Sequence, residues 1–265
     1  MASKTTIAII GGGNMGEALI KGLHQSHKLI VAEANLSRAT YLKKKYRLTI
    51  ADSAHAAAAA RIIVFAVKPQ DMLSAITSVK AHNSKSPQLF ISIAAGLTTR
   101  FFEKHLNTRA RVIRTMPNMP ALIGEGITAI AAGKYATTAD LKTAQQILKT
   151  IGQTVIVKES MIDAVTAVSG SGPAYVFLFV EQWMAAAKKL GFNDKEAKEL
   201  VYQTLLGSAH LLSQSTFDAA TLRAKVTSKG GTTQAAMDVF THKKFNIIMK
   251  DALQAAKTRA KQLAQ

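Results

Sequence analysis

The chain has 265 residues, of which 48% are hydrophobic, so it is long enough to bury a core and is not intrinsically disordered. It has no cysteine, which excludes disulfides, thiolate metal sites and a cysteine nucleophile and fits a reducing compartment. The formal charge of +18 comes from cations spread along the chain, with one run of three lysines at 43–45. We therefore expect a basic surface that attracts anionic small molecules, and no nucleic-acid interface.

The N-terminal segment predicts a cytoplasmic protein. Lys4 leads directly into the short apolar run 5–10, without the long apolar stretch and small-residue cleavage site of a signal peptide. The most apolar segment, 172–187, is interrupted by Glu181 after about ten residues, whereas roughly 20 are needed to cross a bilayer. This segment therefore predicts a buried helix and no membrane partner.

Residues 5–165 alternate short apolar segments with helical ones. The strand candidates are rich in Ile and Val and are bounded by Gly, Pro, Asp or Asn: 6–10, 28–33, 61–67, 88–94, 111–116, 126–132 and 152–157. Helical spacing of apolar residues marks 16–26, 38–46 and 138–152, and the alanine-rich run 54–61 is also expected to be helical because alanine is the best helix former. The alternation favours an α/β fold, a Rossmann-like doubly wound parallel sheet covered by helices on both faces.

Beyond residue 160 the strand pattern stops. Five helical segments follow, separated by Gly, Asn, Ser or Thr: 171–191, 194–214, 218–226, 232–240 and 246–265. We therefore expect two domains, an NAD(P)-binding Rossmann-like domain at 1–160 and an all-helical domain at 161–265.

The first glycine cluster predicts a dinucleotide site. Gly11, Gly13 and Gly16 have the G-x-G-x-x-G spacing, directly after a predicted strand and directly before a predicted helix. In such a turn the first glycine permits the tight bend, the second lets the backbone approach a pyrophosphate, and the third lets helix and strand pack closely. The helix N-terminus supplies N–H groups and partial positive charge for the phosphates.

The residues after the second strand leave the identity of the dinucleotide open. Glu33 stands where an acid would hold the ribose 2′-OH of NAD. Asn35, Ser37 and Arg38 follow and are suited to the 2′-phosphate of NADP, with the arginine offering a bidentate fork. We expect NADP(H) to be favoured and NAD(H) to be possible.

Three further strand ends carry small or polar residues, and each is expected at the carboxyl edge of the sheet where ligands bind. They are Lys68 after the third strand candidate, the segment 92–98, and the segment 114–121. The seven histidines are scattered, and only His24 and His27 share a helical face, without nearby carboxylates. We therefore expect no metal site.

Six motifs occur in one order along nearly the whole chain: IAIIGGGNMGEAL, AVKPQ, ISIAAG, IRTMPNMPA, VSGSGPAYVF and VTSKGGTTQAAMDVF. In these motifs the chain closely resembles the pyrroline-5-carboxylate reductase family, and the last two are the most specific. The resemblance implies an enzyme that passes hydride from NAD(P)H to the C=N carbon of 1-pyrroline-5-carboxylate and gives L-proline. It also implies a homodimer built through interlocked helical domains, possibly within a larger ring such as a decamer, in which each active site uses the glycine–threonine loop of the partner chain.

The motif and the resemblance together imply a set of site residues. The predicted cofactor-binding residues are Gly11, Gly12, Gly13, Asn14, Met15, Gly16, Asn35, Arg38, Ser53, Ala66, Val67, Lys68, Pro69, Ala94, Ala95 and Gly96. The predicted substrate-binding residues are Ser228, Gly230, Gly231, Thr232 and Thr233. Thr233 is the predicted catalytic residue, as the hydroxyl that hydrogen-bonds the substrate ring nitrogen and relays a proton. The difficult chemistry would belong to the cofactor, which explains why no His, Cys, Asp or Glu stands near enough in the sequence to make a familiar catalytic set with this loop.

The sequence departs from the family pattern at three places. Lys229 stands where the family usually has proline, and Asp218-Ala219 stands where it has His-Pro. Glu33-Ala34 stands where many members have Asn-Arg or Ser/Thr. Among rival functions, a β-hydroxyacid dehydrogenase would need a catalytic lysine with an asparagine a turn later, and Lys188 and Lys189 have no asparagine at that spacing. A basic nucleic-acid-binding protein on a Rossmann scaffold is the alternative outside enzymology.

Overall fold

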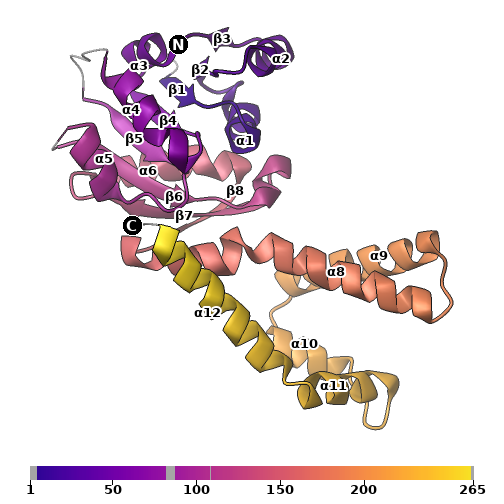
Figure 1. The fold of residues 1–265 in the computed structure, drawn as a ribbon. Coiled ribbons are helices and arrows are strands. Elements are labelled where there is room, and N and C mark those ends of the chain that lie inside the picture. The colour runs from indigo at the N-terminus through magenta and orange to yellow at the C-terminus, as the bar shows by residue number, and fades with distance from the viewer. Residues whose placement is uncertain (1–4, 82–86, 108, 264–265) are drawn as a thin grey trace. The chain divides into compact units, whose positions relative to one another are not determined.

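The structure is a computed structural model that describes residues 5–81, 87–107 and 109–263. The chain divides into two compact units. One unit runs to Pro173 and includes the chain from Ala256 onward, and the other is Ala174–Ala255 (Figure 1).

The first unit is built on one sheet. Within the described residues the sheet has eight strands in the order β3-β2-β1-β4-β5-β6-β7-β8. The strands are β1 Thr6–Ile10, β2 Lys28–Ala32, β3 Thr49–Ile50, β4 Ile62–Phe65, β5 Leu89–Ser92, β6 Arg111–Met116, β7 Gly126–Ala132 and β8 Gly152–Ile156. Strands β1 to β6 pair in parallel, which confirms the predicted doubly wound α/β fold. The short strand β3 was not predicted from the sequence.

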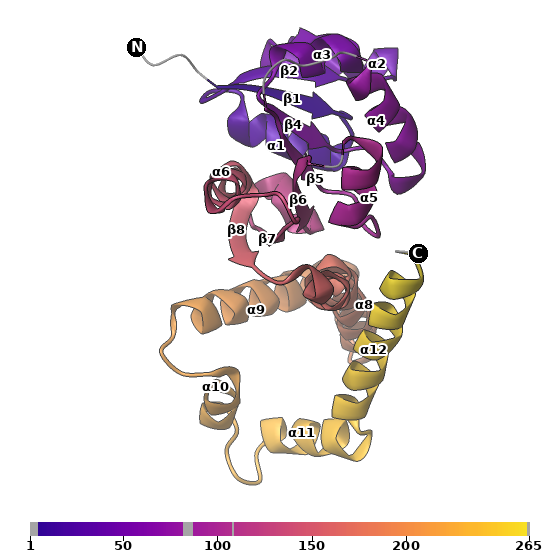
Figure 2. The same cartoon turned by 90° about the vertical axis from the view of Figure 1, so that its left-hand side faces the viewer.

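Helices cover both faces of this sheet (Figure 2). The described helices of the unit are α1 Asn14–Leu23, α2 Leu36–Tyr46, α3 Ser53–Ala59, α4 Met72–Lys80, α5 Thr99–His105, α6 Thr138–Leu148 and the short α7 Ile162–Val165. Buried side chains of α1, α2 and α6 belong to one core cluster, and those of α3, α4 and α5 belong to another. The alanine-rich run is helical, as predicted.

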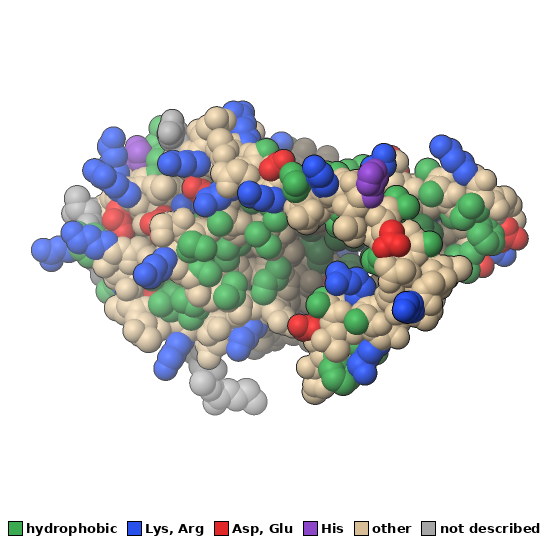
Figure 3. Space-filling model, turned by 90° about the horizontal axis from the view of Figure 1, so that it is seen from below, with side chains coloured by type: hydrophobic (Ala, Val, Ile, Leu, Met, Phe, Trp, Pro, Cys, Tyr) green, Lys and Arg blue, Asp and Glu red, His purple; other side chains and the backbone are tan. Residues whose placement is uncertain are grey.

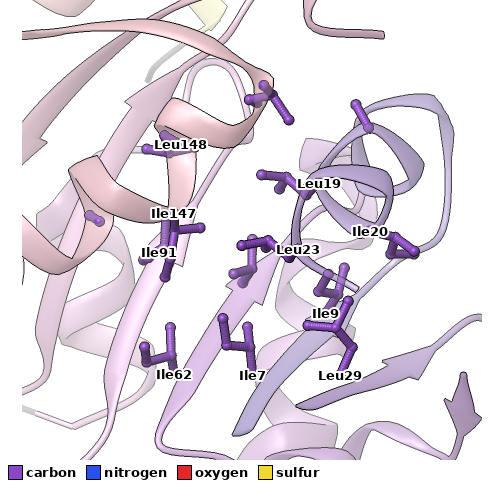
Figure 4. Close-up of a cluster of buried hydrophobic side chains, with 14 of the residues drawn as sticks. Ile7, Ile9, Leu19, Ile20, Leu23, Leu29, Ile62, Ile91, Ile147 and Leu148 are labelled. Atoms are coloured by element: carbon purple, nitrogen blue, oxygen red, sulfur yellow. The ribbon is translucent and has the colours of Figure 1, made fainter. Parts of the chain in front are cut away.

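The strand periodicity of two sorts side chains between the two cores. Ile7 and Ile9 of β1 belong to the cluster shared with α1 and α6, whereas Ala8 and Ile10 belong to the cluster shared with α3 and α4. Figure 4 shows the first of these clusters, in which Leu19 and Leu23 of α1 lie against the strands. Burying each such leucine or isoleucine contributes about 1.5–3 kcal/mol, so the sheet is held from both sides by apolar contact.

The sheet is not fully parallel, because β7 pairs antiparallel with β6. The predicted doubly wound sheet is therefore mostly parallel, and the length of the connection explains the one reversal among the described strands. A parallel crossover needs a dozen or more residues, and β6 is joined to β7 by a short segment that contains only the 3₁₀ turn η2 Met119–Ile123. Strand β8 then follows helix α6 and returns parallel to β7.

The second unit is made of helices. They are α8 Gly172–Lys189, whose first residues belong to the first unit, α9 Asp194–Gln214, α10 Ala219–Lys225, α11 Thr232–His242 and the first part of α12 Phe245–Leu263. Sequence signals set the helix starts: Asn193 and Glu196 form a capping box at α9, and the Asp218 side chain accepts the Thr221 N–H at α10. The helical composition of this region was predicted.

Helix α8 is not buried in the chain taken by itself, which corrects the prediction for 172–187. Val176, Phe177, Leu178 and Phe179 are all exposed, and the helix buries only Ala187. The helical run Glu159–Lys189 is also long and apolar enough to cross a membrane by length and composition. Apolar composition predicts that a helix is covered but does not identify what covers it, and this is why the prediction failed.

The basic residues do not gather in one patch on the face shown in Figure 3, where Lys and Arg side chains are scattered among apolar ones. The scatter on this face agrees with the solvated basic surface expected from the sequence.

Candidate active site

The turn between β1 and α1 forms the floor of the candidate cofactor site. The Gly11 N–H donates to the Ala32 carbonyl at 2.8 Å, and the Ala66 N–H donates to the Ile10 carbonyl at 2.8 Å, so the turn is joined to β2 and β4. A methyl group on Gly16 would lie 2.2 Å from the Gly11 carbonyl oxygen, so only glycine allows helix and strand to approach this closely. The N-cap of α1 is Gly13, which has no side chain to cap the first-turn N–H groups. These donors suit a pyrophosphate.

A cleft of about 930 Å³ opens beside this turn, at the carboxyl ends of β1, β2 and β4. Its lining includes six of the predicted cofactor residues: Gly11, Gly13, Ser53, Ala66, Val67 and Lys68. Asp52, Ser74 and Ser78 also line it, and the sequence analysis did not single them out. Their signal in the sequence is weak, because Ser74 and Ser78 are ordinary polar positions one turn apart on helix α4. The size of the cleft and the free helix N-terminus fit a dinucleotide.

The other predicted cofactor residues do not line this cleft. Gly12 and Gly16 are buried in the turn, and Met15 packs against the core. Asn14 is the first residue of α1, Asn35 is the N-cap of α2, Pro69 begins a 3₁₀ turn, and Ala94, Ala95 and Gly96 follow β5. Their contacts with a cofactor stay predictions.

Glu33 and Arg38 both hold the peptide groups of Gly12. Glu33 Oε2 accepts the Gly12 N–H at 2.7 Å, and its Oε1 accepts the Asn35 N–H at 2.8 Å. Arg38 Nε donates to the Gly12 carbonyl at 2.7 Å, and its Nη2 donates to Glu17 Oε2 at 2.5 Å. The two residues that the sequence analysis weighed for NAD against NADP are thus both attached to the glycine turn.

Glu17 anchors this arrangement from helix α1. Its Oε1 accepts hydrogen bonds from Lys45 Nζ at 3.0 Å, from the Tyr46 hydroxyl at 2.8 Å and from the Tyr41 hydroxyl at 3.1 Å. Burial by itself raises the pKa of Glu17, but the hydrogen bonds from Lys45, Tyr46 and Arg38 outweigh it and lower the pKa to about 2. The carboxylate is therefore ionised throughout the physiological range, and it fixes α2 to α1.

The depressed pKa makes Glu17 a source of pH-dependent stability. Its pKa falls from 4.5 to about 2 on folding, so ionised Glu17 stabilises the protein above about pH 4.5, and this contribution is lost as the pH falls toward 2. We expect Glu17→Gln to lower the urea midpoint of unfolding at pH 7. At pH 3 we expect the midpoints of the variant and the wild type to differ by less than they do at pH 7. Glu125→Gln, at an exposed glutamate outside this cluster, is the control. An equal difference at both pH values would contradict the assignment.

The predicted substrate loop lies in the second unit, between α10 and α11. The Gly231 N–H donates to the Ser228 carbonyl at 3.0 Å, and Gly230 has φ +72 at the third position of this turn. Lys229, at the second position, has no positive φ, so Ser228–Gly231 is a type II turn. The Gly231 N–H is engaged in the turn, which leaves the N–H groups at the start of α11 as the available donors.

Thr232 and Thr233 occupy the first two positions of α11, because the N-cap is Gly231. Neither hydroxyl therefore caps the helix. Within residues 5–81, 87–107 and 109–263, neither hydroxyl forms a hydrogen bond, whereas the hydroxyl of nearby Thr227 donates to the Arg223 carbonyl at 2.7 Å. Two hydroxyls and a helix N-terminus are thus available to a ligand that carries an anion and a polar ring atom.

A glycine turn between strand and helix, opening on a cleft at the switch point of a doubly wound sheet, is typical of a dinucleotide-dependent oxidoreductase. Two family models match the chain: NADP oxidoreductase, coenzyme F420-dependent, over residues 6–96, and pyrroline-5-carboxylate reductase dimerisation over residues 159–263. The chain belongs to the pyrroline-5-carboxylate reductase family, as its motifs predict.

Full-length relatives support this membership. The chain is 39% identical to the pyrroline-5-carboxylate reductase of Mycobacterium tuberculosis, with 97% of this chain and 96% of the relative covered. It is 38% identical to the enzyme of Haemophilus influenzae, with 97% of each covered. Among solved structures, a pyrroline-5-carboxylate reductase from Coxiella burnetii matches with a TM-score of 0.93 and 33% identity over 99% of this chain and 100% of that one. The Plasmodium falciparum pyrroline carboxylate reductase with NADP bound matches with a TM-score of 0.86 and 30% identity over 98% of each chain.

Proposed function

We propose that this chain reduces 1-pyrroline-5-carboxylate to L-proline with hydride from NADPH, or from NADH as an alternative donor. The observation that carries the proposal is the start of α11, where helix N–H groups and two uncommitted threonine hydroxyls stand after the turn Ser228–Gly231. A substrate with one carboxylate and one ring nitrogen needs this combination of groups.

The cofactor supplies the hydride, and the residues of the first unit are suited to hold it. The first-turn N–H groups of α1 would bind the pyrophosphate, with Gly13 allowing close approach of the backbone. Lys68, exposed at the end of β4 and in the lining of the cleft, adds positive charge beside the phosphates. NADP(H) is the favoured cofactor, which agrees with the match to an NADP oxidoreductase family model.

The residues of the α11 loop would bind and orient the substrate. The N–H groups of Thr232 and Thr233 would hold the carboxylate, helped by the helix dipole, and Ser228 lies beside them at the turn. The Thr233 hydroxyl would hydrogen-bond the ring nitrogen of the substrate and help to keep that nitrogen protonated. The protonated C=N bond is the better hydride acceptor, so positioning is the main task of the protein.

The match to the dimerisation family model over residues 159–263 supports an oligomeric assembly. We propose that a second copy of the chain, rather than lipid, covers the exposed apolar residues of α8, and that a decamer forms from such dimers. The functional division then falls at 1–160 for the cofactor and 161–265 for substrate binding and dimerisation. We also propose a cytoplasmic location, which agrees with the cysteine-free composition. Light scattering without detergent measures the molar mass of the particle and so tests the assembly. A monodisperse monomer would exclude both the dimer and the decamer.

The reaction is tested by mixing purified protein with 1-pyrroline-5-carboxylate and NADPH, and separately with NADH. We expect loss of reduced-nicotinamide absorbance and formation of an equal amount of L-proline, identified by mass spectrometry. The control is the same mixture without the imine. Oxidation of neither cofactor by a folded, oligomeric sample would refute the proposed function.

Lys229 is expected to limit the rigidity of the substrate loop. It occupies the second position of a type II turn, where proline is favoured because its fixed φ matches the turn. We expect Lys229→Pro to raise the unfolding free energy by about 0.4–1 kcal/mol, or Tm by roughly 1–3 °C, because the unfolded chain loses freedom. Lys229→Gln removes the charge but not the flexibility and should leave Tm unchanged. Calorimetry decides, and a fall in Tm with proline would show that the turn has another geometry.

A further inference from the structure

The peptide groups of Gly12 are held from both sides by residues of the β2–α2 segment. The Gly12 N–H donates a hydrogen bond to Glu33, and the Gly12 carbonyl accepts one from Arg38. Gly12 lies within the glycine turn that fits the pyrophosphate, so the segment that would contact the adenosine ribose and the turn that would contact the phosphates form one hydrogen-bonded body.

We infer that Glu33 and Arg38 have different tasks in this body: Glu33 sets the ratio of NADPH to NADH use, and Arg38 is a positioning residue for the glycine turn and not a ligand of the 2′-phosphate. The inference rests on the proposed function, because it assumes that a nicotinamide dinucleotide occupies the cleft.

Glu33 has the geometry of a discriminating residue. It lines the cleft at the end of β2, which is the place where an acid meets the ribose 2′-hydroxyl. Two backbone N–H groups, those of Gly12 and Asn35, fix its carboxylate at 2.7 and 2.8 Å, so it cannot turn away from an approaching phosphate without losing both bonds. A fixed negative charge disfavours a second one nearby. Glu33 therefore limits the preference for the phosphorylated ribose over the plain ribose.

Arg38 is engaged elsewhere. Its Nε and Nη2 donate to the Gly12 carbonyl and to Glu17, and it is absent from the described lining of the cleft. If Arg38 turned toward a phosphate, Glu17 would lose one of its donors and keep only those from Lys45 and two tyrosines. The Gly12 carbonyl would also lose its hydrogen bond from the arginine. The arginine therefore acts through Gly12, and its loss should weaken every ligand that uses the turn by the same factor.

Two probes separate these tasks without turnover. Adenosine 2′,5′-bisphosphate and adenosine 5′-monophosphate differ by the 2′-phosphate alone, and calorimetry gives their Kd values for the full-length protein. We expect Glu33→Gln, which keeps one acceptor, to improve the bisphosphate relative to the monophosphate by about tenfold, the effect of about 1.4 kcal/mol of removed repulsion. We expect Arg38→Gln to weaken both probes alike, and Arg38→Lys to recover part of the loss. The ratio of kcat/KM for NADPH to that for NADH should rise in Glu33→Gln and stay unchanged in Arg38→Gln.

Glu125→Gln is the control, because it removes an equal charge from an exposed glutamate that is not in the described lining of the cleft. It should leave the probe ratio unchanged. The inference is overturned if Glu33→Gln leaves the ratio unchanged, if Glu125→Gln shifts it equally, or if Arg38→Gln weakens only the bisphosphate while Tm is kept. A folded wild-type protein that oxidises neither NADPH nor NADH with the imine would refute the proposed function instead, so the two failures are distinguishable.

Discussion

Replacing Gly13 by alanine is expected to weaken NADPH and NADH binding by roughly 100-fold while Tm falls little. A methyl group on Gly13 would meet no atom within 4 Å, and the φ of −62 suits any residue, so the protein without ligand tolerates it. Replacing glycine by alanine at an N-cap lowers the free energy of unfolding by about 1 kcal/mol at most. The bound pyrophosphate, however, needs the close approach that the second glycine of this motif allows, and a methyl group displaces it.

Gly16→Ala is the informative partner of this variant. Its methyl group would lie 2.2 Å from the Gly11 carbonyl oxygen, which is backbone and cannot turn aside. Strand and helix must separate, so we expect a loss of about 1–3 kcal/mol of stability together with the loss of binding. Calorimetric Kd and Tm on the same preparations distinguish the variants. Unchanged dinucleotide binding by Gly13→Ala would show that the pyrophosphate lies elsewhere.

The sheet could be read from the sequence wherever local signals and burial agreed. The apolar runs 6–10, 61–67 and 111–116 became β1, β4 and β6 because a strand buried on both faces has a continuous run of Ile and Val. Direction was less accessible, since the antiparallel pairing of β7 with β6 depends on the length of a connection rather than on strand composition. The two-residue strand β3 is too short to give any periodic signal.

The site divides in the same way. The spacing of the glycines determines the conformation of the turn Gly11–Gly13, so the sequence predicts this turn directly. The hydrogen bonds that join Gly12 to Glu33 and Arg38, and Arg38 to Glu17, connect residues 21 to 26 positions apart in the chain. No local pattern encodes such contacts, because they require β2 and α2 to be in place first. The exposure of α8 was missed for a different reason, because apolar composition does not identify what covers a helix.

Replacing Thr233 by alanine is expected to lower kcat/KM for 1-pyrroline-5-carboxylate by roughly 10-fold to 1000-fold, the range for loss of one positioned hydrogen-bond or proton-transfer group. The rival interpretation is that Thr232 and Thr233 stabilise the helix start, a role worth about 1 kcal/mol with turnover intact. The structure weakens that interpretation, since Gly231 occupies the N-cap and Thr233 lies one position inside the helix proper. A loss of activity without a loss of Tm is therefore the expected result.

Two further variants sharpen this test of Thr233. Thr233→Ser keeps the hydroxyl and should retain most of the activity, because serine can make the same hydrogen bond. Thr241→Ala removes a hydroxyl from the same helix that donates to the Met237 carbonyl at 2.9 Å, so it should leave kcat/KM unchanged. Wild-type turnover in a folded Thr233→Ala protein would remove this residue from the reaction and leave the α11 N–H groups as the substrate-binding element. If the serine variant is as inactive as alanine, the methyl group and not the hydroxyl is what the substrate requires.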